Sequence, residues 1–519
     1  MFPGSTDLAG YWRDVVAGVD CIGPVPEGHS WSVADHHDPD PTVPDKTWAT
    51  RGGFLDPVAF DPLQHGLPPA MLESVDTTQL LALLVAREAL RDAGLDPDAE
   101  GWDRSKVSVV LGVTGPQELA VTVGTRLQGP LFRKALARCG VSDAVADAVV
   151  RDIANHLPGW TEQTFPGLLA NVAAGRIANR LDLGGTNAVV DAACASSLAA
   201  VQFAVAELAS GRSDLALTGG VDALNDAFMH QCFTRTPALS RAGDTRPFDV
   251  DADGILLGEG VAVLAMKRLA DAERDGDRVY AVLRGLGSSS DGRHKSIYAP
   301  NADGQAVALR RAYARAGFGP ETVELVEAHG TGTRAGDAAE VEALTRVFAE
   351  TGRGGRWAAL GSVKAQIGHT KGTAGAAGLV KAALALHQRV LPPSAKVARP
   401  NPKLGLDQGP LYLSPRARPW IRAADHPRRA GVSAFGFGGS NFHAVLEEHG
   451  DGQVAAVAPA EAQLFLLGGD LEAQLDALDP ADPVRASREA LARWRGGERV
   501  VAFLARDAAE LRQRVARAR

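Results

Sequence analysis

The chain alternates between short runs of consecutive apolar residues and longer segments whose apolar residues recur at helical spacing. The short runs have the length and β-branched content of buried strands. They lie at residues 107–113, 187–190, 215–220, 323–327 and 358–363. Helical spacing is found at residues 76–93, 305–316 and 337–348, and from residue 374 onward. This alternation of strands and helices predicts an α/β architecture with covered sheets.

Two apolar runs closer to the middle of the chain, at 261–267 and 280–286, flank a stretch rich in acidic and basic residues. We expect these runs to form a pair of neighbouring strands joined by that stretch. Residues 1–70 are rich in Pro, Asp and Gly and are expected to form loops and short elements. Residues 115–170 are expected to be mostly helical.

Two pairs of polar residues have the spacing of a capping box at the start of a helix. Asp76 stands three positions before Gln79, and Asp337 three positions before Glu340. In a capping box the first side chain and the fourth each bond a backbone N–H of the first turn. The pattern therefore predicts a structural role for Asp337 and Glu340.

Amino-acid composition shifts near Glu447, after which the chain is rich in Ala, Arg and Asp. Two apolar runs, at 464–467 and 500–504, lie among short amphipathic segments. We expect residues 448–519 to form a small α/β linker unit toward a following domain.

Composition and charge limit the possible functions. The net charge of -8 disfavours a general nucleic-acid binder, whose surface would be basic. The four cysteines are far apart and form no CxxC pair, which fits a reducing compartment and a cytoplasmic location. The apolar run at 374–386 contains Lys381 and is too short to cross a membrane. Asp35-His36-His37-Asp38 has no second ligand cluster, so we expect a solvated turn and no metal site.

Cys194 lies where the apolar strand at 187–190 meets a helix that is apolar nearly all round. Only small residues flank it. A sharp turn between strand and helix would expose the thiol, as a nucleophile elbow does for serine. The start of the helix would favour the thiolate. This stretch alone is equally compatible with a nucleophile and with a buried structural cysteine.

Two histidines follow buried strands, at the end where α/β sheets bind ligands. His329 lies in the segment 327–333, whose glycine spacing does not match a dinucleotide-binding loop. His369 follows Lys364 by five positions and precedes a helix of very small residues. A further glycine loop, at 435–441, could direct a backbone N–H toward an oxyanion. A thiol, two histidines and such a loop are the groups that acyl transfer through a cysteine requires.

Five motifs in order resemble those of the β-ketoacyl synthases. They are Asp191-Ala-Ala-Cys-Ala-Ser-Ser197, Glu327-Ala-His-Gly-Thr-Gly-Thr333, Gly361-Ser-Val-Lys364, Gly368-His369 and Gly436-Phe-Gly-Gly439. The resemblance covers roughly residues 2–447. Within the family, the segments 191–194 and 289–300 are similar to ketosynthase domains of bacterial polyunsaturated fatty acid synthases and related iterative type I polyketide synthases. Enediyne-type and other iterative synthases share much of this similarity.

The resemblance implies a thiolase-like fold, an α-β-α-β-α sandwich of two similar halves, usually in a homodimer. The halves are expected at residues 1–250 and 251–447. The resemblance also implies a decarboxylative condensation between an acyl group on Cys194 and malonyl thioester on an acyl carrier protein. No cofactor is expected apart from the phosphopantetheine of the carrier, and further synthase domains or subunits are possible partners.

The resemblance assigns the site residues one by one. His329 and His369 would stabilise the enolate, and Lys364 would orient the His329 side and supply positive charge. The N–H groups of Cys194 and Phe437 would form the oxyanion hole, with Phe437 also gating the pocket. Thr331 and Thr333 would meet the phosphopantetheine arm.

Three other readings compete with a ketosynthase. A chain-length-factor-like partner subunit would lack the cysteine, and the complete set of Cys194 and two histidines disfavours it. Thiolases and acyl-CoA-loading condensing enzymes differ at the second histidine, so His369 favours the decarboxylating type. A cysteine hydrolase would need a water-activating arrangement that the motifs do not supply.

The sequence also leads to expectations about a basic surface patch and about one strand edge. Carrier proteins are usually acidic, so we expect a local basic patch on this chain to receive the carrier. The candidate patches are Arg133-Lys134 with Arg138, and Arg293 with Lys295. The alternative for each patch is an ordinary solvated face without a partner. Members of the resembled family usually carry an apolar strand before the Phe-Pro-Gly turn, which here is Phe2-Pro3-Gly4. Without that strand, a neighbouring strand edge is expected to be unpaired.

Overall fold

The computed structural model describes residues 1–115, 117–236, 238–293, 295–450, 462–497 and 499–519. The chain forms two compact units, Met1–His449 and Gly450–Arg519.

The first unit contains a four-stranded sheet with the strand order β4-β3-β5-β6. Its strands are β3 (Val107–Gly112), β4 (Asn187–Val190), β5 (Leu215–Asp222) and β6 (Gly260–Met266). β3 is parallel to β4 and β5, whereas β6 is antiparallel to β5. Every residue of β3 and β5 is buried, as the continuous apolar runs predict for a sheet covered on both faces.

The same unit contains a six-stranded sheet with the order β11-β9-β8-β13-β14-β7. Its strands are β7 (Val282–Ser290), β8 (Leu325–Glu327), β9 (Ala358–Gly361), β11 (Leu411–Leu413), β13 (Arg429–Gly436) and β14 (Ser440–Glu447). β8 is parallel to β9 and β13, and β14 is antiparallel to β13. The four strands β9-β8-β13-β14 therefore repeat the arrangement of β4-β3-β5-β6.

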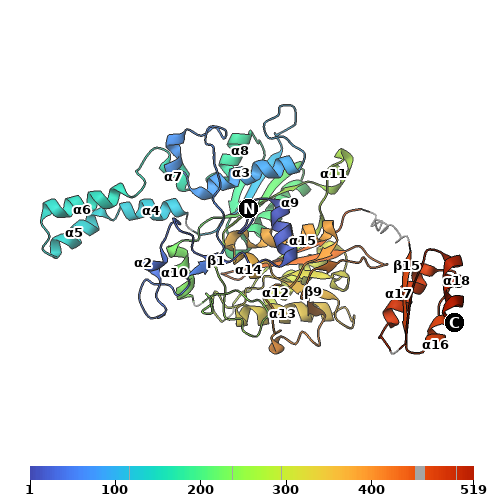
Figure 1. The fold of residues 1–519 in the computed structure, drawn as a ribbon. Helices are drawn as coiled ribbons and strands as arrows, with labels where there is room; N and C mark the ends of the chain where they lie inside the picture. Colours follow the sequence, from blue (N-terminus) through green and yellow to red (C-terminus); the bar gives the residue numbers. More distant parts are fainter. Residues whose placement is uncertain (116, 237, 294, 451–461, 498) are drawn as a thin grey trace. The chain divides into compact units, whose positions relative to one another are not determined.

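Helices cover both sheets and fill the space between them (Figure 1). On the outer faces lie α3 (Thr77–Asp92) and α8 (Asn171–Leu181) for the first sheet, and α12 (Ala302–Ala316) and α13 (Arg334–Ala349) for the second. Between the sheets lie α9 (Ser196–Ala209) and α15 (Ala374–Gln388), which contribute Leu198 and Leu379 to one shared core. The layers thus run α-β-α-β-α, which confirms the expected sandwich of two similar halves.

The expected strand pair at 261–267 and 280–286 is wrong. β6 pairs with β5 in the first sheet, and β7 pairs with β14 in the second. The charged stretch between them forms a short helix, α11 (Leu269–Asp275), where the prediction required a turn. An apolar run identifies a strand but not its partner, because pairing depends on distant segments. β6 belongs to the first sheet and ends at Met266, so that sheet includes residues beyond 250, where the first half was expected to end.

The capping box expected at Asp76 is also wrong in its second half. Asp76 is the N-cap of α3, and its carboxylate accepts the N–H of Thr78 at 2.9 Å. Gln79 does not reach back to the N-cap. Its amide donates to the carbonyl of Gly167 at 2.8 Å and accepts from Arg176 at 3.0 Å, so this side chain ties α3 to α8 and to the segment before it.

The described part of the region 115–170 is mostly helical, as expected, and α5 and α6 project from the body of the unit (Figure 1). It contains α4 (Glu118–Arg126), α5 (Gly129–Arg138), α6 (Asp143–Asn155) and α7 (Thr164–Leu168). The remaining short elements of the first unit are α1 (Leu8–Ala17), β1 (Gly23–Pro24), α2 (Val33–His36), β2 (Arg51–Gly52), α10 (Ala227–Arg235), α14 (Lys364–Ile367), β10 (Val390–Leu391) and β12 (Arg418–Pro419).

Within the described ranges, no group of three or more His, Cys, Asp or Glu side chains is placed to hold a metal ion. Nor does any helix in this part of the chain have the length and apolar character needed to cross a membrane.

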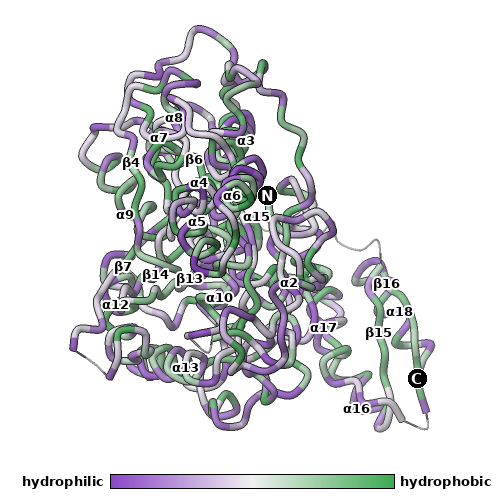
Figure 2. Tube along the Cα trace, turned by 90° about the vertical axis from the view of Figure 1, so that its left-hand side faces the viewer, coloured by the Kyte–Doolittle hydropathy of each residue, from purple (hydrophilic) through white to green (hydrophobic). Residues whose placement is uncertain are grey.

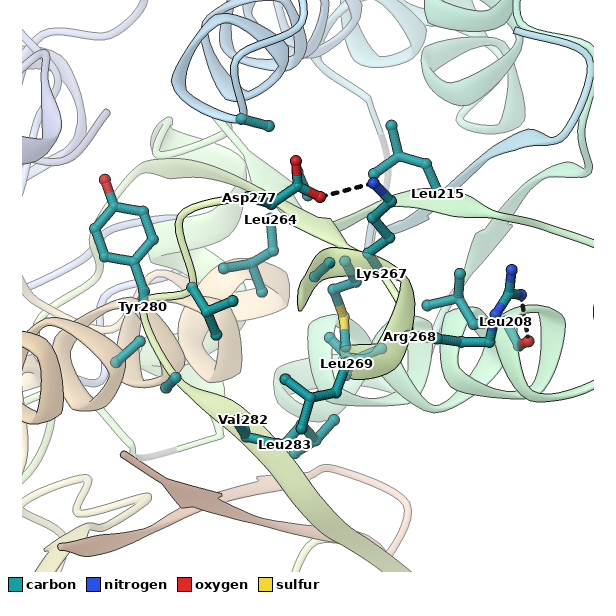
Figure 3. A pocket seen from close by; sticks show the side chains of 18 of the residues that line it. Leu208, Leu215, Leu264, Lys267, Arg268, Leu269, Asp277, Tyr280, Val282 and Leu283 are labelled. Carbon is teal, nitrogen blue, oxygen red and sulfur yellow. Dashed lines mark hydrogen bonds and ion pairs between the residues drawn. The ribbon is translucent and has the colours of Figure 1, made fainter. Parts of the chain in front are cut away.

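Among the described residues, no strand pairs with the outer edge of β6 beyond its first residues. Val261 exchanges both backbone hydrogen bonds with Met1, at 2.8 and 2.9 Å, and burial decreases from Val263 to Met266. In the second sheet, β7 occupies the corresponding place beside β14. A mostly apolar cavity of about 930 Å³ lies along the free edge of β6, with Leu264, Tyr280 and Leu283 in its wall (Figure 3). The expectation of an unpaired edge is confirmed.

The second unit, Gly450–Arg519, is a small α/β fold. Two antiparallel strands, β15 (Gln463–Gly468) and β16 (Val500–Ala505), are mostly hydrophobic (Figure 2). They pack with α16 (Leu471–Asp476), α17 (Pro483–Arg493) and α18 (Ala508–Ala518) around a core that includes Phe465 and Leu511. Residues 451–461 of the expected linker unit lie outside the described residues.

A buried ion pair lies near the end of the first unit. The stability of a truncated chain therefore depends on whether it retains Glu448 and His449. The Glu448 carboxylate accepts from the backbone N–H of Arg428 at 2.9 Å and from its guanidinium at 2.6 Å. Both side chains are buried. Removing one partner of such a pair costs about 3–5 kcal/mol. We therefore expect a chain that ends at His449 to fold, and one that ends at Glu447 to unfold at a clearly lower temperature.

Thermal denaturation of the two truncated chains, with Glu448→Gln in the longer one as the control, measures this difference. Equal melting temperatures would contradict the role of Glu448. Loss of folded protein in both would show that the first unit depends on the second.

Candidate active site

Cys194 lies in a sharp turn between β4 and α9. The turn is one 3-10 segment, Ala193–Ala195, in which Ala193 has a left-handed backbone with φ of 51°. That conformation is uncommon for a residue other than glycine and marks a constrained turn. The Asp191 carboxylate accepts the N–H of Ala193 at 2.9 Å, and the Ser196 hydroxyl donates to its carbonyl at 2.6 Å. The expected turn between strand and helix is confirmed.

The environment of Cys194 does not favour the thiolate, contrary to the expectation from the start of the helix. The residue is 6 % exposed, and burial raises the pKa of its thiol to about 11. The charges of Lys364 and Lys371 and the N–H of Phe437 act in the opposite direction, and Asp222 adds to the increase. Desolvation is the largest of these effects, so the resting residue is a thiol at neutral pH.

His329 follows β8 and is held through its backbone and its ring. The Glu340 carboxylate accepts the N–H groups of His329 and Gly330, both at 2.7 Å. The ring Nδ1 accepts the backbone N–H of Phe435 at 3.3 Å. A ring nitrogen that accepts a hydrogen bond carries no proton, so the neutral imidazole has its hydrogen on Nε2.

His369 is held in the same tautomer by a different segment. Its Nδ1 accepts the backbone N–H of Lys371 at 3.0 Å, and its own N–H donates to the carbonyl of Leu256 at 2.7 Å. Burial, with further contributions from Lys364 and Lys371, lowers the pKa of His369 well below its usual range. Burial and the charge of Lys364 do the same for the pKa of His329. Both rings are therefore neutral Nε2–H donors at neutral pH.

The three residues meet at one cavity of about 110 Å³, which Cys194, His329 and His369 all line. The two imidazole rings lie nearly perpendicular, with centroids 5.6 Å apart. Two neutral N–H donors beside a thiol can stabilise negative charge that develops on a substrate oxygen.

Lys364, at the start of α14, is buried close to this cavity. Burial lowers the pKa of its ammonium, while the charges of Glu327, Glu340 and Cys194 act in the opposite direction. Lys364 is therefore close enough to these carboxylates and to the thiol for their charges to act on its ammonium.

The loop after β13 brings Phe437 to the thiol. The backbone N–H of Phe437 lies near the sulfur of Cys194 and acts to lower the pKa of the thiol. Gly436 permits this approach, because a Cβ there would lie 2.1 Å from the carbonyl oxygen of Ala192. The Phe437 ring is 44 % exposed and stacks on Phe233 at a centroid distance of 6.0 Å.

Thr331 and Thr333 also line the cavity, with their hydroxyl oxygens 3.0 Å apart. Thr333 is the N-cap of α13, and its hydroxyl accepts the N–H of Gly336 at 3.2 Å. One of the two hydroxyls thus already stabilises the start of a helix.

Asp337 and Glu340 do not form the expected capping box, because α13 begins earlier, at Arg334. Their carboxylates instead accept backbone N–H groups of the loop that carries His329 and hold that loop in place. Asp337 accepts the N–H groups of Gly332 and Phe248, at 3.0 and 2.7 Å. Burial raises the pKa of Asp337 to about 6 and that of Glu340 to about 7. Their role is structural, as expected, but they stabilise the loop of His329 and not the start of a helix.

Sequence reasoning missed two buried ion pairs around the site. Lys381 pairs with Glu327 at 2.5 Å, and Lys371 pairs with Asp222 at 3.0 Å. Both lysines interrupt segments of small or apolar residues, and Asp222 ends an apolar strand. An ionisable residue inside an otherwise apolar element was the available signal.

A five-layered sandwich whose cysteine turn and two strand-end histidines line one small cavity is the architecture of the thiolase-like class of proteins. Family models agree with this architecture. Residues 1–272 match the β-ketoacyl synthase N-terminal domain, and residues 280–398 match its C-terminal domain. Residues 400–489 match the ketoacyl-synthetase C-terminal extension. The chain belongs to the β-ketoacyl synthase family.

Individual relatives are large synthases. One component of the polyunsaturated fatty acid synthase of Thraustochytrium sp. is 42 % identical over 86 % of this chain, which spans 16 % of that protein. A mycocerosic acid synthase-like polyketide synthase of Mycolicibacterium smegmatis is 36 % identical over 93 % of this chain, which spans 21 % of it. The ketosynthase from module 6 of the bacillaene synthase of Bacillus subtilis superposes with a TM-score of 0.72 at 30 % identity, covering 99 % of this chain and 82 % of its own.

Proposed function

We propose that this chain catalyses the decarboxylative Claisen condensation of an acyl group on Cys194 with malonyl-acyl carrier protein, giving 3-oxoacyl-acyl carrier protein. One observation carries the proposal: backbone N–H groups occupy Nδ1 of both His329 and His369, which line the cavity with Cys194, so Nε2 of each ring is the nitrogen that carries the proton. The product would enter polyunsaturated fatty acid or polyketide biosynthesis, which the two kinds of relatives support.

The first half-reaction loads the enzyme. The sulfur of Cys194 attacks the thioester carbonyl of an acyl carrier, and the thiol proton leaves with the departing phosphopantetheine thiol. The backbone N–H groups of Cys194 and Phe437 would hold the oxyanion of the tetrahedral intermediate. Phe437 already lies against the sulfur, and its exposed ring would have to move to admit an acyl chain.

The second half-reaction forms the carbon–carbon bond. Malonyl thioester loses carbon dioxide, and the enolate oxygen accepts the Nε2–H groups of His329 and His369. The enolate carbon attacks the acyl carbonyl on Cys194, and the intermediate expels the Cys194 thiolate, which regains a proton. Lys364 supplies positive potential to the enolate, and buried donors act more strongly than donors in water.

Phosphopantetheine of the carrier would enter past Thr331 and Thr333, which line the cavity. Beyond that group, the proposed reaction needs no cofactor. A chain-length-factor-like partner subunit is the alternative from another class, and an enediyne-type or other iterative synthase is the alternative pathway. Cys194 with both histidines in one cavity favours the catalytic reading.

We also propose that the chain acts as a homodimer in the cytoplasm, with further synthase domains or subunits as partners. The outer edge of β4 is available for pairing, because β3 is its only neighbour in the described sheet and Asn187 is exposed. An unpaired strand edge is a common site of association between chains. The cysteines Cys21, Cys139, Cys194 and Cys232 are all free, in keeping with a reducing compartment.

Intact-protein mass spectrometry tests the proposed function. The chain is incubated with a panel of acyl thioesters and then with malonyl-acyl carrier protein. The expected result is a mass gain on Cys194 that disappears on addition of the malonyl carrier, together with carbon dioxide and a 3-oxoacyl product. Acylation that malonyl carrier cannot discharge would contradict the condensation.

The two candidate carrier patches differ in how far their charge is already compensated. Arg133 on α5 pairs with Asp147 at 2.5 Å and lies 3.3 Å from Asp143. Arg293 and Lys295 are exposed in the loop that also contributes Ile297 to the cavity. His294, between them, lies outside the described residues. The second patch is therefore the better candidate.

Lys295→Glu is expected to raise the KM for carrier-bound substrate severalfold, because it places a negative charge opposite an acidic carrier, and to leave small thioester analogues nearly unchanged. Arg133→Glu serves as the matched control with little effect on either substrate. Steady-state kinetics on both substrate types measure the difference. Equal effects of Lys295→Glu on carrier-bound and small substrates would exclude this patch.

A further inference from the structure

One buried ion pair beside the cavity has no role in the reaction described above. Lys371 Nζ lies 3.0 Å from the Asp222 carboxylate, and both side chains are 3 % exposed. The pair joins the end of β5 to the 3-10 segment Lys371–Thr373, which packs against the turn that carries Cys194. A buried pair of this kind is costly to desolvate, so a hydrophobic pair would often be at least as stable.

The backbone of Lys371 is constrained. Its φ of 44° lies in the left-handed region, which residues with a side chain adopt at a cost. That conformation directs the N–H of Lys371 to Nδ1 of His369, at 3.0 Å. The contact comes from the main chain, so for this hydrogen bond the side chain matters through the backbone that it holds.

Four contacts fix this conformation through the side chains of the pair. Lys371 Nζ donates to the carbonyl of Gly258 at 2.9 Å and contacts Asp222. The Asp222 carboxylate in turn accepts the N–H of Gly372 at 3.2 Å and that of Leu224 at 3.4 Å. The residue with the constrained φ is thus held on both sides, by its own ammonium and by the N–H of the next residue.

We propose that the Asp222–Lys371 ion pair is the positioning device for His369: it holds Lys371 in the left-handed conformation that directs its N–H to Nδ1 and so keeps the imidazole in the Nε2–H tautomer. The inference rests on the proposed function for its consequence, the delivery of Nε2–H to the enolate. Asp222 and Lys371 are positioning residues, because neither touches the reacting atoms.

The charge of Lys371 supports the same outcome. Together with burial and Lys364, it lowers the pKa of His369, so the ring stays neutral. Asp222 balances that charge, and Lys371 in turn opposes the burial that raises the pKa of Asp222 to about 6. At neutral pH the Asp222 carboxyl is therefore mainly ionised.

The first test is the variant Asp222→Asn, which leaves the Lys371 ammonium without its partner. We expect decarboxylation of malonyl thioester to slow at least about tenfold in kcat, since small misplacements of a reacting group are costly. Acylation of Cys194 should change by less than about threefold, because the N–H groups of Cys194 and Phe437 stay in place. Nitrogen-15 NMR of the histidine rings should show His369 shifting from pure Nε2–H to a mixture of tautomers.

A matched control separates positioning from loss of stability. Glu448→Gln breaks the buried Arg428–Glu448 pair, which has no residue at the cavity. It is expected to lower the melting temperature without changing the His369 tautomer or the ratio of decarboxylation to acylation. If Asp222→Asn behaves like Glu448→Gln in both readouts, the pair is merely structural and the proposal is overturned.

A second pair of variants remains informative if Asp222→Asn folds poorly. Asp222→Asn with Lys371→Gly removes both charges and supplies a residue that adopts positive φ freely. Asp222→Asn with Lys371→Ala removes both charges without that freedom. We expect the glycine variant to retain the Nε2–H tautomer and at least about fivefold more decarboxylation than the alanine variant. Equal behaviour of the two would overturn the proposal.

The tautomer signal also separates this inference from the proposed function. If the unmodified chain released no carbon dioxide but its His369 tautomer still depended on Asp222, the proposed function would fail and the positioning role would stand.

Discussion

Cys194→Ala is expected to abolish both self-acylation and condensation while leaving decarboxylation of malonyl thioester in place. The thiol is the only proposed acyl acceptor, whereas the enolate needs only the Nε2–H groups of His329 and His369. Decarboxylation could even rise, if the emptied pocket resembles the acylated state. Intact mass and released carbon dioxide, measured on the same sample, report the two half-reactions separately.

Cys139→Ala is the matched control for this variant, because Cys139 is exposed and does not line the cavity. It should retain acylation, condensation and decarboxylation at their original rates. Residual acylation in Cys194→Ala would mean that another residue accepts the acyl group. Loss of decarboxylation in the same variant would mean that the thiol takes part in forming the enolate.

His369→Ala is expected to give the opposite pattern. Cys194 should still become acylated, because the turn, the start of α9 and the two oxyanion N–H groups are unchanged. Decarboxylation should fall by about two orders of magnitude or more, the usual loss when a donor to a developing oxyanion is removed. A persistent mass gain on Cys194 without carbon dioxide release is the expected observation.

The control here is His156→Ala, since His156 is exposed at the end of α6 and far along the chain from the motifs. It should change neither half-reaction. If His369→Ala blocked acylation and still released carbon dioxide, His369 would be the base for Cys194. The assignment of the two half-reactions would then be reversed.

The motifs that define the site were readable in the sequence because each lies at the end of a local pattern. Cys194 follows an apolar strand and precedes an apolar helix, and His329 and His369 each follow a buried run. The ends of β8 and β9 lie on one side of the second sheet, so the segments that carry the two histidines converge there. Cys194 follows β4 in the first sheet, and it meets the histidines only because the two sheets pack together. The position of Phe437 in a glycine loop is likewise a local pattern.

Pairing and electrostatics could not be inferred in this way. β6 and β7 are adjacent in sequence and lie in different sheets, because their partners β5 and β14 come from distant parts of the chain. The start of a helix predicted a thiolate at Cys194, yet burial by several elements raises the pKa of the thiol to about 11. Burial is a property of the packed chain, and no local pattern contains it.

The sequence by itself determined the class of fold, the cysteine turn and the two histidines, since apolar periodicity and turn chemistry are local properties. Only the tertiary structure decided how those groups are held. The carboxylate of Glu340 reaches back to the N–H of His329, and Asp222 reaches from β5 to Lys371 beside His369. Such contacts join residues that are 11 to 149 positions apart, and they form only when the sheets and central helices are packed.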